Sequence, residues 1–265
     1  MPKLKRTTDE RQARGDGPEF IESLDRGLRV IQAFAADHRP MTLSDVAKAC
    51  DLPRATARRI LITLQKTGFV SGDERMFSLT PRVLALASAY LASNQIVAVM
   101  QPLMDEVSTR AREVCSLAIL DGDEAVFIAR ASPARVFSAG IDVGYRLPAY
   151  CTSVGRILLG RLSHADLAAT IAAMTLTPQT PETVTDRSTV VATIIADHEK
   201  GYSLVDREAE PGFRSISVPI RRYDGAIVAA ANIGAHVDRI ATGEMIERFL
   251  PLLQEMAHAA KPLLM

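Results

Sequence analysis

The chain has 265 residues, of which 48% are hydrophobic and 23% charged, and its formal net charge is zero. This length suits two domains, and this balance of residues excludes a disordered or fibrous protein. The charged start, the lack of an apolar run of membrane-spanning length and the three scattered cysteines argue against a signal peptide, a membrane protein and a disulfide framework, so we expect a cytoplasmic protein without a membrane partner.

The charge is distributed unevenly along the chain. Residues 1–82 hold 15 Lys and Arg against 11 Asp and Glu, a net charge of +4, which leaves −4 for residues 83–265. Phosphate binding needs local rather than global positive charge. The split is modest, but it suits an N-terminal part that contacts nucleic acid and a larger part with another task.

The first 19 residues show no apolar periodicity, which predicts a flexible tail over 1–19. After Ser23, apolar residues recur at helical spacing, and the sequence at 38–40 ends that run. A second, short helix is predicted after Thr42, because Thr42 and Asp45 have the spacing of a capping box.

A third helix is predicted from Arg54 to Gly68, after the tight turn at 51–53. Two helices joined by so short a turn form a helix-turn-helix. No acidic residue lies between Pro53 and Thr67, which is typical of a helix that reads DNA. We expect DNA contacts from Thr42, Arg54, Ala55, Thr56, Arg58 and Arg59. The positive charge of this helix, taken alone, fits an ordinary solvent-exposed helix equally well.

Two short β-prone runs follow, around the polar turn at 71–75, and predict a wing. Arg75 at the tip of the wing is a further candidate for DNA contact, although polar hairpin tips are common. Thr80 then caps a helix rich in Leu and Ala. We therefore expect a winged helix-turn-helix domain over 20–80 and a linker helix over 81–96, which could serve dimerisation or packing equally well.

The remaining residues, 97–265, mix helical and strand-like patterns. In chain order they predict a helix at 99–111, a hairpin at 114–131, a strand at 135–144, helices at 152–162, 163–174 and 187–201, strands at 202–210, 215–222 and 226–235, and a closing helix from Thr242. This order predicts an α+β domain with a mainly antiparallel sheet, whose connections are long enough to hold a ligand cleft.

Polar residues of this second domain suggest ligand contacts. Cys151, Thr152 and Ser153 precede the helix at 152–162, whose free N–H groups could hold a carboxylate, although a simple N-cap is the commoner arrangement. Alternating acids within the strand predicted at 202–210 would share one face and bind a metal or arginines, with a solvated face as the commoner alternative: Asp206, Glu208 and Glu210. Candidate partners for an acidic ligand are Arg135, Arg146 and Arg214.

Signs of an enzyme are few. The chain lacks GxSxG, GxxxxGK[ST], GxGxxG and HExxH motifs, and its five histidines are scattered. Cys151 could form a nucleophile pair with a histidine only if the fold brought the two together. We predict no catalytic residue, no metal site and no cofactor.

Four stretches are specific when taken together: SLDRGLRVIQAF, MTLSDVAKACDLPRATARRILITLQKTGFV, LPAYCTSVGRILL and DREAEPGFRSISVPI. From about Phe20 to the C-terminus the chain resembles the IclR family of bacterial transcription regulators. The segment RLPAYCTSVGR and the two consecutive arginines of ATARRIL are most similar to sequences of the branch that controls the β-ketoadipate pathway, the PcaR, PcaU and PobR type.

The resemblance implies a GAF-like effector-binding domain over 97–265, and a homodimer or dimer of dimers on a double-stranded operator that is an imperfect palindrome. The implied effector is a small organic acid such as protocatechuate, 4-hydroxybenzoate or β-ketoadipate. Carried over by motif, the effector site is formed by Ser153, Val154, Asp206, Phe213, Ser215, Asn232 and Gly234. Asn232 and Gly234 stand where relatives that bind very small oxoacids can have serines, which implies a different acid.

No single cation stands out for the carboxylate of that acid, so the helix start after Thr152 is its expected holder. The predicted function is that of a transcription regulator of aromatic-acid catabolism. Two alternatives stay open from the residues: an enzyme that acts on a small carboxylate and uses its winged helix for protein contact, and an architectural DNA binder without a ligand.

Overall fold

The computed structural model describes residues 19–37, 39–73, 75–133 and 142–265. The chain divides into two compact units, Met1–Tyr90 and Leu91–Met265. Each unit has a hydrophobic core of its own, as separate domains do. Most of the strand predicted at 135–144 lies outside the described residues.

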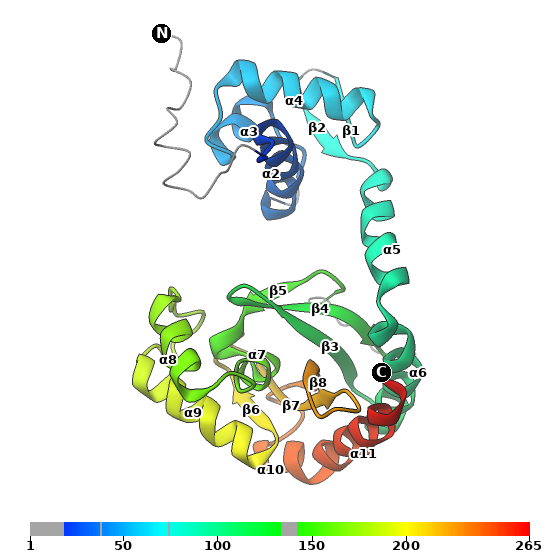
Figure 1. The fold of residues 1–265 in the computed structure, drawn as a ribbon, viewed down its shortest axis with the longest axis vertical. Coiled ribbons are helices and arrows are strands. Elements are labelled where there is room, and N and C mark those ends of the chain that lie inside the picture. Colours follow the sequence, from blue (N-terminus) through cyan, green and yellow to red (C-terminus); the bar gives the residue numbers. More distant parts are fainter. Residues whose placement is uncertain (1–18, 38, 74, 134–141) are drawn as a thin grey trace. The chain divides into compact units, whose positions relative to one another are not determined.

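The described part of the first unit consists of helices and one hairpin (Figure 1). The elements are α2 (Glu22–Asp37), α3 (Leu43–Ala49), α4 (Arg54–Lys66), β1 (Val70–Gly72) and β2 (Phe77–Leu79). Val30, Val46, Leu61 and Phe77 belong to its buried cluster, one from each of α2, α3, α4 and β2. Burial of such side chains stabilises the fold by about 1.5–3 kcal/mol each, so the core fixes which face α4 presents to solvent.

Local signals in the sequence set where these helices begin and end. The Thr42 Oγ1 accepts a hydrogen bond from the Asp45 amide (3.2 Å), and the Asp45 carboxylate accepts one from the Thr42 amide (2.9 Å). The predicted capping box is therefore confirmed. After α4 the chain reverses at Gly68, whose φ of +78° favours glycine. β1 and β2 pair as an antiparallel hairpin, which completes the predicted winged helix-turn-helix.

The segment predicted as one linker helix at 81–96 is interrupted. A 3-10 turn at Pro81–Val83 leads into α5 (Leu84–Ser93), and α6 (Gln95–Ala111) follows after one residue. Asn94 marks the break, because its Oδ1 accepts a hydrogen bond from the Ile96 amide (3.1 Å) and so caps α6. The boundary between the two units falls within α5. No single helix in the described ranges has the length and apolarity to cross a membrane, and α5 with its preceding turn reaches them only in a bent pair with α6.

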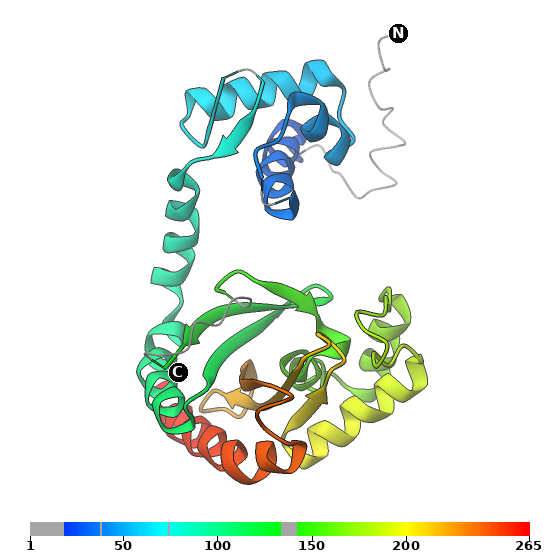
Figure 2. The same cartoon turned by 180° about the vertical axis from the view of Figure 1, so that it is seen from behind.

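Six strands form one sheet in the second unit (Figure 1). In chain order they are β3 (Val114–Asp121), β4 (Glu124–Ala131), β5 (Arg146–Pro148), β6 (Ser203–Asp206), β7 (Phe213–Arg221) and β8 (Ile227–His236). Across the sheet the order is β5-β4-β3-β8-β7-β6, and each neighbouring pair is antiparallel. The predicted mainly antiparallel sheet is thus confirmed, and the view from behind shows it curling around α7 (Figure 2).

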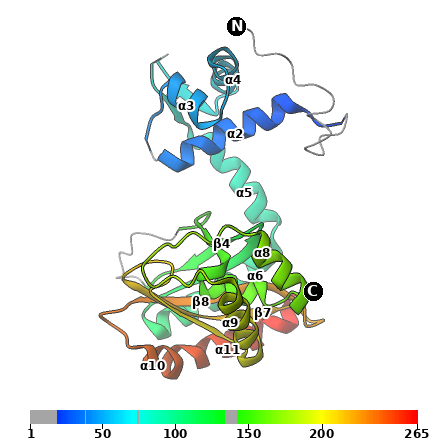
Figure 3. The same ribbon diagram turned by 90° about the vertical axis from the view of Figure 1, so that its left-hand side faces the viewer.

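Helices cover the two faces of this sheet unequally. α6 and α11 (Leu250–Ala260) pack on the face that carries Leu117, Ile216 and Ala231. α7 (Ser153–Leu159) packs on the opposite face, against β3, β7 and β8. Beyond α7, α9 (Arg187–Lys200) contacts β6, and α8 (His164–Ala173) contacts α9 (Figure 3). The short α10 (Thr242–Glu244) and a π-helical turn (Met245–Phe249) lead into α11.

Because α7 has only seven residues, it covers only part of its face of the sheet. Its apolar side chains Val154, Ile157 and Leu158 cluster with small and aromatic residues of the strands. Gly155 lets α7 approach the preceding 3-10 turn, since a Cβ at this position would lie 2.6 Å from the carbonyl carbon of Ala149. The uncovered part of the face is where a ligand can reach the strands.

Candidate functional site

The outer surface of α4 carries the predicted basic residues. Arg54, Ala55, Arg58 and Arg59 are exposed, and Thr56 is half-buried. None of the salt bridges found within the described ranges involves α4, which contains no acidic residue. The opposite stripe, including Ala57, is buried. These side chains are therefore placed to meet phosphates and base edges of a duplex.

Two further predicted DNA contacts lie outside α4. Thr42 is half-buried, and its hydroxyl is engaged in capping α3. Arg75 is exposed in the turn between β1 and β2, where its amide donates a hydrogen bond to the Asp73 carboxylate (3.1 Å). Arg75 thus has a side chain available at the wing, whereas the hydroxyl of Thr42 has a structural role in the helix cap.

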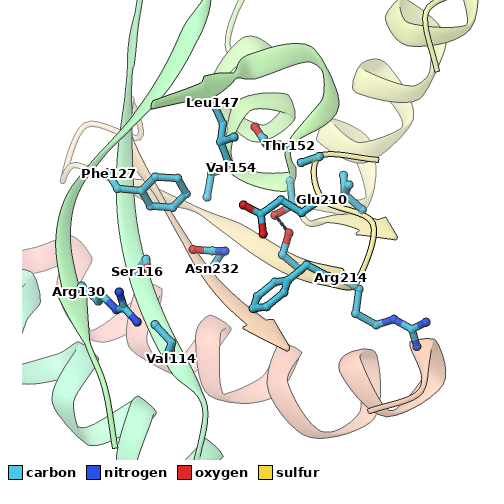
Figure 4. Close-up of a pocket in the computed structure, with 16 residues that line it drawn as sticks. Val114, Ser116, Phe127, Arg130, Leu147, Thr152, Val154, Glu210, Arg214 and Asn232 are labelled. Carbon is cyan, nitrogen blue, oxygen red and sulfur yellow. Dashed lines mark hydrogen bonds between the residues drawn. The ribbon is translucent and has the colours of Figure 1, made fainter. Parts of the chain in front are cut away.

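A cavity of about 750 Å³, including its open mouth, lies on the face of the sheet that α7 partly covers (Figure 4). The residues that line it come from all six strands, from the start of α7 and from the segment after β6: Val114, Ser116, Phe127, Arg130, Leu147, Thr152, Ser153, Val154, Val205, Ala209, Glu210, Phe213, Arg214, Ser215, Asn232 and Gly234.

Polar residues form a row across the floor of this pocket. Asn232, Ser116 and Arg130 are direct neighbours on β8, β3 and β4, in that order, and all three line the pocket. Asn232 is 7% exposed, and its Oδ1 is buried without a hydrogen-bond partner among the described residues. An unsatisfied buried polar atom costs about 1–3 kcal/mol, so Asn232 is a natural hydrogen-bonding site for a ligand in the pocket.

The start of α7 forms one wall. The predicted N-cap is confirmed for Thr152, whose Oγ1 accepts a hydrogen bond from the Gly155 amide (3.1 Å). The Ser153 hydroxyl is hydrogen-bonded to that of Ser215 on β7 (2.8 Å). Both serines line the pocket, and the bond joins α7 to the floor beneath it.

Of the seven residues carried over as an effector site, six line the pocket: Ser153, Val154, Phe213, Ser215, Asn232 and Gly234. Asp206 does not. Its carboxylate pairs with Arg214 (Nε–Oδ1 3.0 Å), whose Nη1 also donates to the Ile240 carbonyl (2.7 Å). The Arg214 side chain accordingly runs away from the pocket (Figure 4), and its ion pair with Asp206 links β7 to β6.

The expectation that Asp206, Glu208 and Glu210 share the face of one strand is wrong. β6 ends at Asp206, and the next residue, Arg207, has a φ of +61°. Glu208 turns inward to pair with Arg156 (2.8 Å), whereas Glu210 lines the pocket. No group of three or more His, Cys, Asp or Glu residues that could hold a metal is found within the described ranges.

The other predicted arginine partners have separate positions. Arg146 is exposed on β5 and pairs with Asp121 and Glu124, both at 2.6 Å. Arg135 lies outside the described residues. The cation that sequence reasoning missed is Arg130, whose side chain is 14% exposed and pairs with Asp142 (2.9 Å). Arg130 pairs with Ser116 across β3 and β4, which places it at the pocket, and this pairing is known only from the structure.

Cys151 does not have the environment of a nucleophile. Its side chain is fully buried, and its Sγ contacts the Pro148 carbonyl (3.6 Å). Burial, with Glu208 as a second cause, raises the pKa of the Cys151 thiol to about 11. Since the thiolate is the reactive form, the structure does not favour the proposed pairing of Cys151 with a histidine.

Comparison with known proteins identifies relatives that match most of the chain. The family model "Bacterial transcriptional regulator IclR C-terminal" matches residues 88–261, and the model "IclR helix-turn-helix domain" matches residues 23–74. The chain is 41% identical to the Pca regulon regulatory protein of Pseudomonas putida over 243 residues, which cover 91% of this chain and 84% of that protein.

It is also 33% identical to the p-hydroxybenzoate hydroxylase transcriptional activator of Acinetobacter baylyi, with 92% of each chain covered. Among solved structures it is similar to an IclR homologue from Microbacterium hydrocarbonoxydans in complex with 4-hydroxybenzoate. That match has a TM-score of 0.74 and 27% identity, and it covers 90% of this chain and 97% of the other.

Proposed function

The chain belongs to the IclR family of bacterial transcriptional regulators, and from this premise we propose that it controls genes of aromatic-acid catabolism in response to a small aromatic carboxylate. The carboxylate binds in the pocket beside α7, and α4 with the β1–β2 wing binds the operator. The observation that carries this proposal is the pocket itself, where the aromatic rings of Phe127 and Phe213 lie with the polar row of the floor.

The names of the relatives support the choice of ligand. One relative regulates the Pca regulon, another activates the p-hydroxybenzoate hydroxylase gene, and a structural relative was crystallised with 4-hydroxybenzoate. A ring-shaped acid suits a pocket with apolar walls and a few convergent polar groups. Protocatechuate and 4-hydroxybenzoate are accordingly the first compounds to test, with β-ketoadipate as the aliphatic alternative.

We further infer that the protein works as a homodimer or a dimer of dimers on an imperfect palindrome. One winged helix-turn-helix reads a single half-site, and two related copies read two half-sites at a fixed spacing. The effector changes operator affinity only if it binds the DNA-competent and the incompetent arrangement unequally. The linker segment around α5 is the covalent route for that change.

The test has two arms. Operator DNA selected from random sequence is titrated with the full chain in fluorescence anisotropy, where Arg59→Ala is expected to lose about 1–3 kcal/mol of binding free energy. Arg146→Ala, an exposed arginine of the second unit, is the matched control. In the second arm, 4-hydroxybenzoate and protocatechuate are expected to raise the melting temperature and to change operator affinity. Unchanged affinity in Arg59→Ala, or no response to either acid, would contradict the corresponding part of the proposal.

A further inference from the structure

The pocket carries charges of opposite sign on different walls. The guanidinium group of Arg130 comes from β4, and the carboxylate of Glu210 comes from the segment that follows β6. Both groups point into the pocket in the close-up view (Figure 4). The pocket therefore has a cationic end and an anionic end.

Sheet order separates these two ends. β3 and β8 lie between β4 and β7, and β6 lies beyond β7. Arg130 on β4 and Glu210 in the segment after β6 therefore reach the pocket from different parts of the sheet.

Arg130 is suited to hold a carboxylate. Its guanidinium presents five N–H donors, and the salt bridge with Asp142 uses Nη1. Asp142 is itself 90% exposed, so its pairing with Arg130 is screened by solvent. A carboxylate inside the pocket reaches Arg130 from the less solvated side, where the attraction is stronger.

Glu210 is suited to accept a hydrogen bond from a ligand and to repel an anion. Within the described part of the chain, no hydrogen bond or salt bridge engages its carboxylate. Burial, followed by the nearby Glu210 carboxylate, raises the pKa of the Tyr145 phenol. The negative charge of Glu210 therefore affects neighbouring groups at this wall. A second carboxylate placed there would be repelled, because it carries the same charge.

Asn232 lies on the floor between the two ends, where its side-chain oxygen has no partner in the described ranges. An amide can donate or accept, and which atom faces the ligand is an assignment made from the hydrogen-bond network. Its neighbour Ser116, which also lines the pocket, can do either as well. The middle of the pocket is therefore adaptable, and the two ends set the polarity of the ligand.

We propose that the pocket selects an acid with two unlike ends: a carboxylate that faces Arg130 and a hydroxyl that donates a hydrogen bond to Glu210. The proposal rests on the function proposed above and narrows its ligand class to hydroxy-substituted monocarboxylates. Dicarboxylates of the same length are rejected, because their second carboxylate meets Glu210.

Three ligands of equal ring size test this in calorimetry on the full chain: 4-hydroxybenzoate, benzoate and terephthalate. The wild type is expected to bind 4-hydroxybenzoate roughly tenfold or more tighter than benzoate, because a hydrogen bond to a charged acceptor is worth that much. Terephthalate is expected to bind weakest of the three. This comparison needs no variant, so it does not depend on how well a variant folds.

Two variants test which residue binds the hydroxyl of the ligand and which binds its carboxylate. Glu210→Gln should remove the preference for the hydroxyl and strengthen terephthalate binding by roughly tenfold. Arg130→Gln should weaken benzoate and 4-hydroxybenzoate by the same factor. The exposed residues Glu247 and Arg146 provide matched controls, and Glu247→Gln and Arg146→Gln should leave all three affinities unchanged.

The outcomes separate the two proposals. If terephthalate binds the wild type as tightly as 4-hydroxybenzoate, or if Glu210→Gln leaves the ratio of the two affinities unchanged, the assigned polarity is wrong while the function as an aromatic-acid sensor stands. If none of the three acids binds a protein that still binds operator DNA, the aromatic effector of the proposed function fails, and the polarity proposal fails with it.

Discussion

Arg156 and Glu208 form a buried ion pair that joins α7 to the segment that follows β6. The Nη2–Oε2 distance is 2.8 Å, and the two side chains are 3% and 12% exposed. Arg156 also donates through Nε to the Tyr150 carbonyl (3.0 Å), and Glu208 accepts from the Val184 amide (3.2 Å). Both charges are therefore hydrogen-bonded, as buried charges need to be.

Removal of one partner of this pair should be costly. Glu208→Gln leaves the guanidinium of Arg156 buried without a counter-charge, and we expect a loss of about 3–5 kcal/mol in the free energy of unfolding. Urea denaturation followed by circular dichroism measures it. Glu182→Gln is the control, because the Glu182–Arg207 pair is wider (3.8 Å) and exposed, and it should cost less than about 1 kcal/mol. Equal effects of the two substitutions would show that burial of the Arg156–Glu208 pair does not matter.

Gly155 offers a second test of how α7 is positioned. A methyl group at this position overlaps the backbone of Ala149, so Gly155→Ala should force α7 away from the 3-10 turn and destabilise the second unit by about 1–3 kcal/mol. Gly243→Ala, at a helical glycine with open space around its Cβ position, should be neutral or slightly stabilising. Thermal unfolding of the two variants is compared, and a Gly155→Ala protein as stable as the wild type would contradict the close approach.

The Cys151 thiol should be unreactive toward iodoacetamide in the native protein at neutral pH. Below pH 9.0 the thiol is protonated in both states, but between 9.0 and about 11 it ionises only when the protein is unfolded. The free energy of unfolding should therefore fall as the pH rises through this window. Cys151→Ala removes this contribution, so the wild type should lose more stability than the variant between pH 8 and 10.5. Parallel pH profiles would show that the pKa is not raised.

Thr42 distinguishes a cap from a DNA contact. Thr42→Ala removes the hydroxyl that caps α3, and we expect a loss of about 1 kcal/mol in stability. Thr42→Ser keeps the hydroxyl and should behave as the wild type. Operator affinity of the alanine variant, measured by anisotropy well below its melting temperature, should change little. A loss of affinity as large as that of Arg59→Ala, with unchanged stability, would make Thr42 a direct contact.

Local signals predicted the elements whose ends are determined by neighbours in the chain. The Thr42–Asp45 capping box is present as predicted, and the helix predicted over 187–201 ends at Gly201, because caps depend on residues within one turn. The four segments that carry the family resemblance indicated the family from the sequence alone, and the matches to the two family models confirm that resemblance.

The pocket was only partly predictable, because its polarity depends on strand pairing. Arg130 and Ser116 are neighbours through the register of β4 on β3, a relationship that no short motif records. The alternation of Asp206, Glu208 and Glu210 suggested one long strand, but the positive φ of Arg207 ends β6 and turns Glu208 into the core. A left-handed arginine leaves no pattern in the sequence, so the separate roles of the three acids could not be read from it.

The length of the turns between strands sets which side chains form the polar row on the pocket floor, and therefore which ligand the pocket binds. Successive residues of a strand face opposite sides of a sheet, so an insertion of one residue in the connection at 222–226 that shifted β8 would replace Asn232 and Gly234 by Ala231 and Ile233 beneath the ligand. Such a shift would also push two polar or small side chains into the packed layer under α6 and α11. New effectors can therefore evolve by exchange of single side chains at fixed positions, whereas a change in turn length between these strands costs the protein its recognition and its fold together.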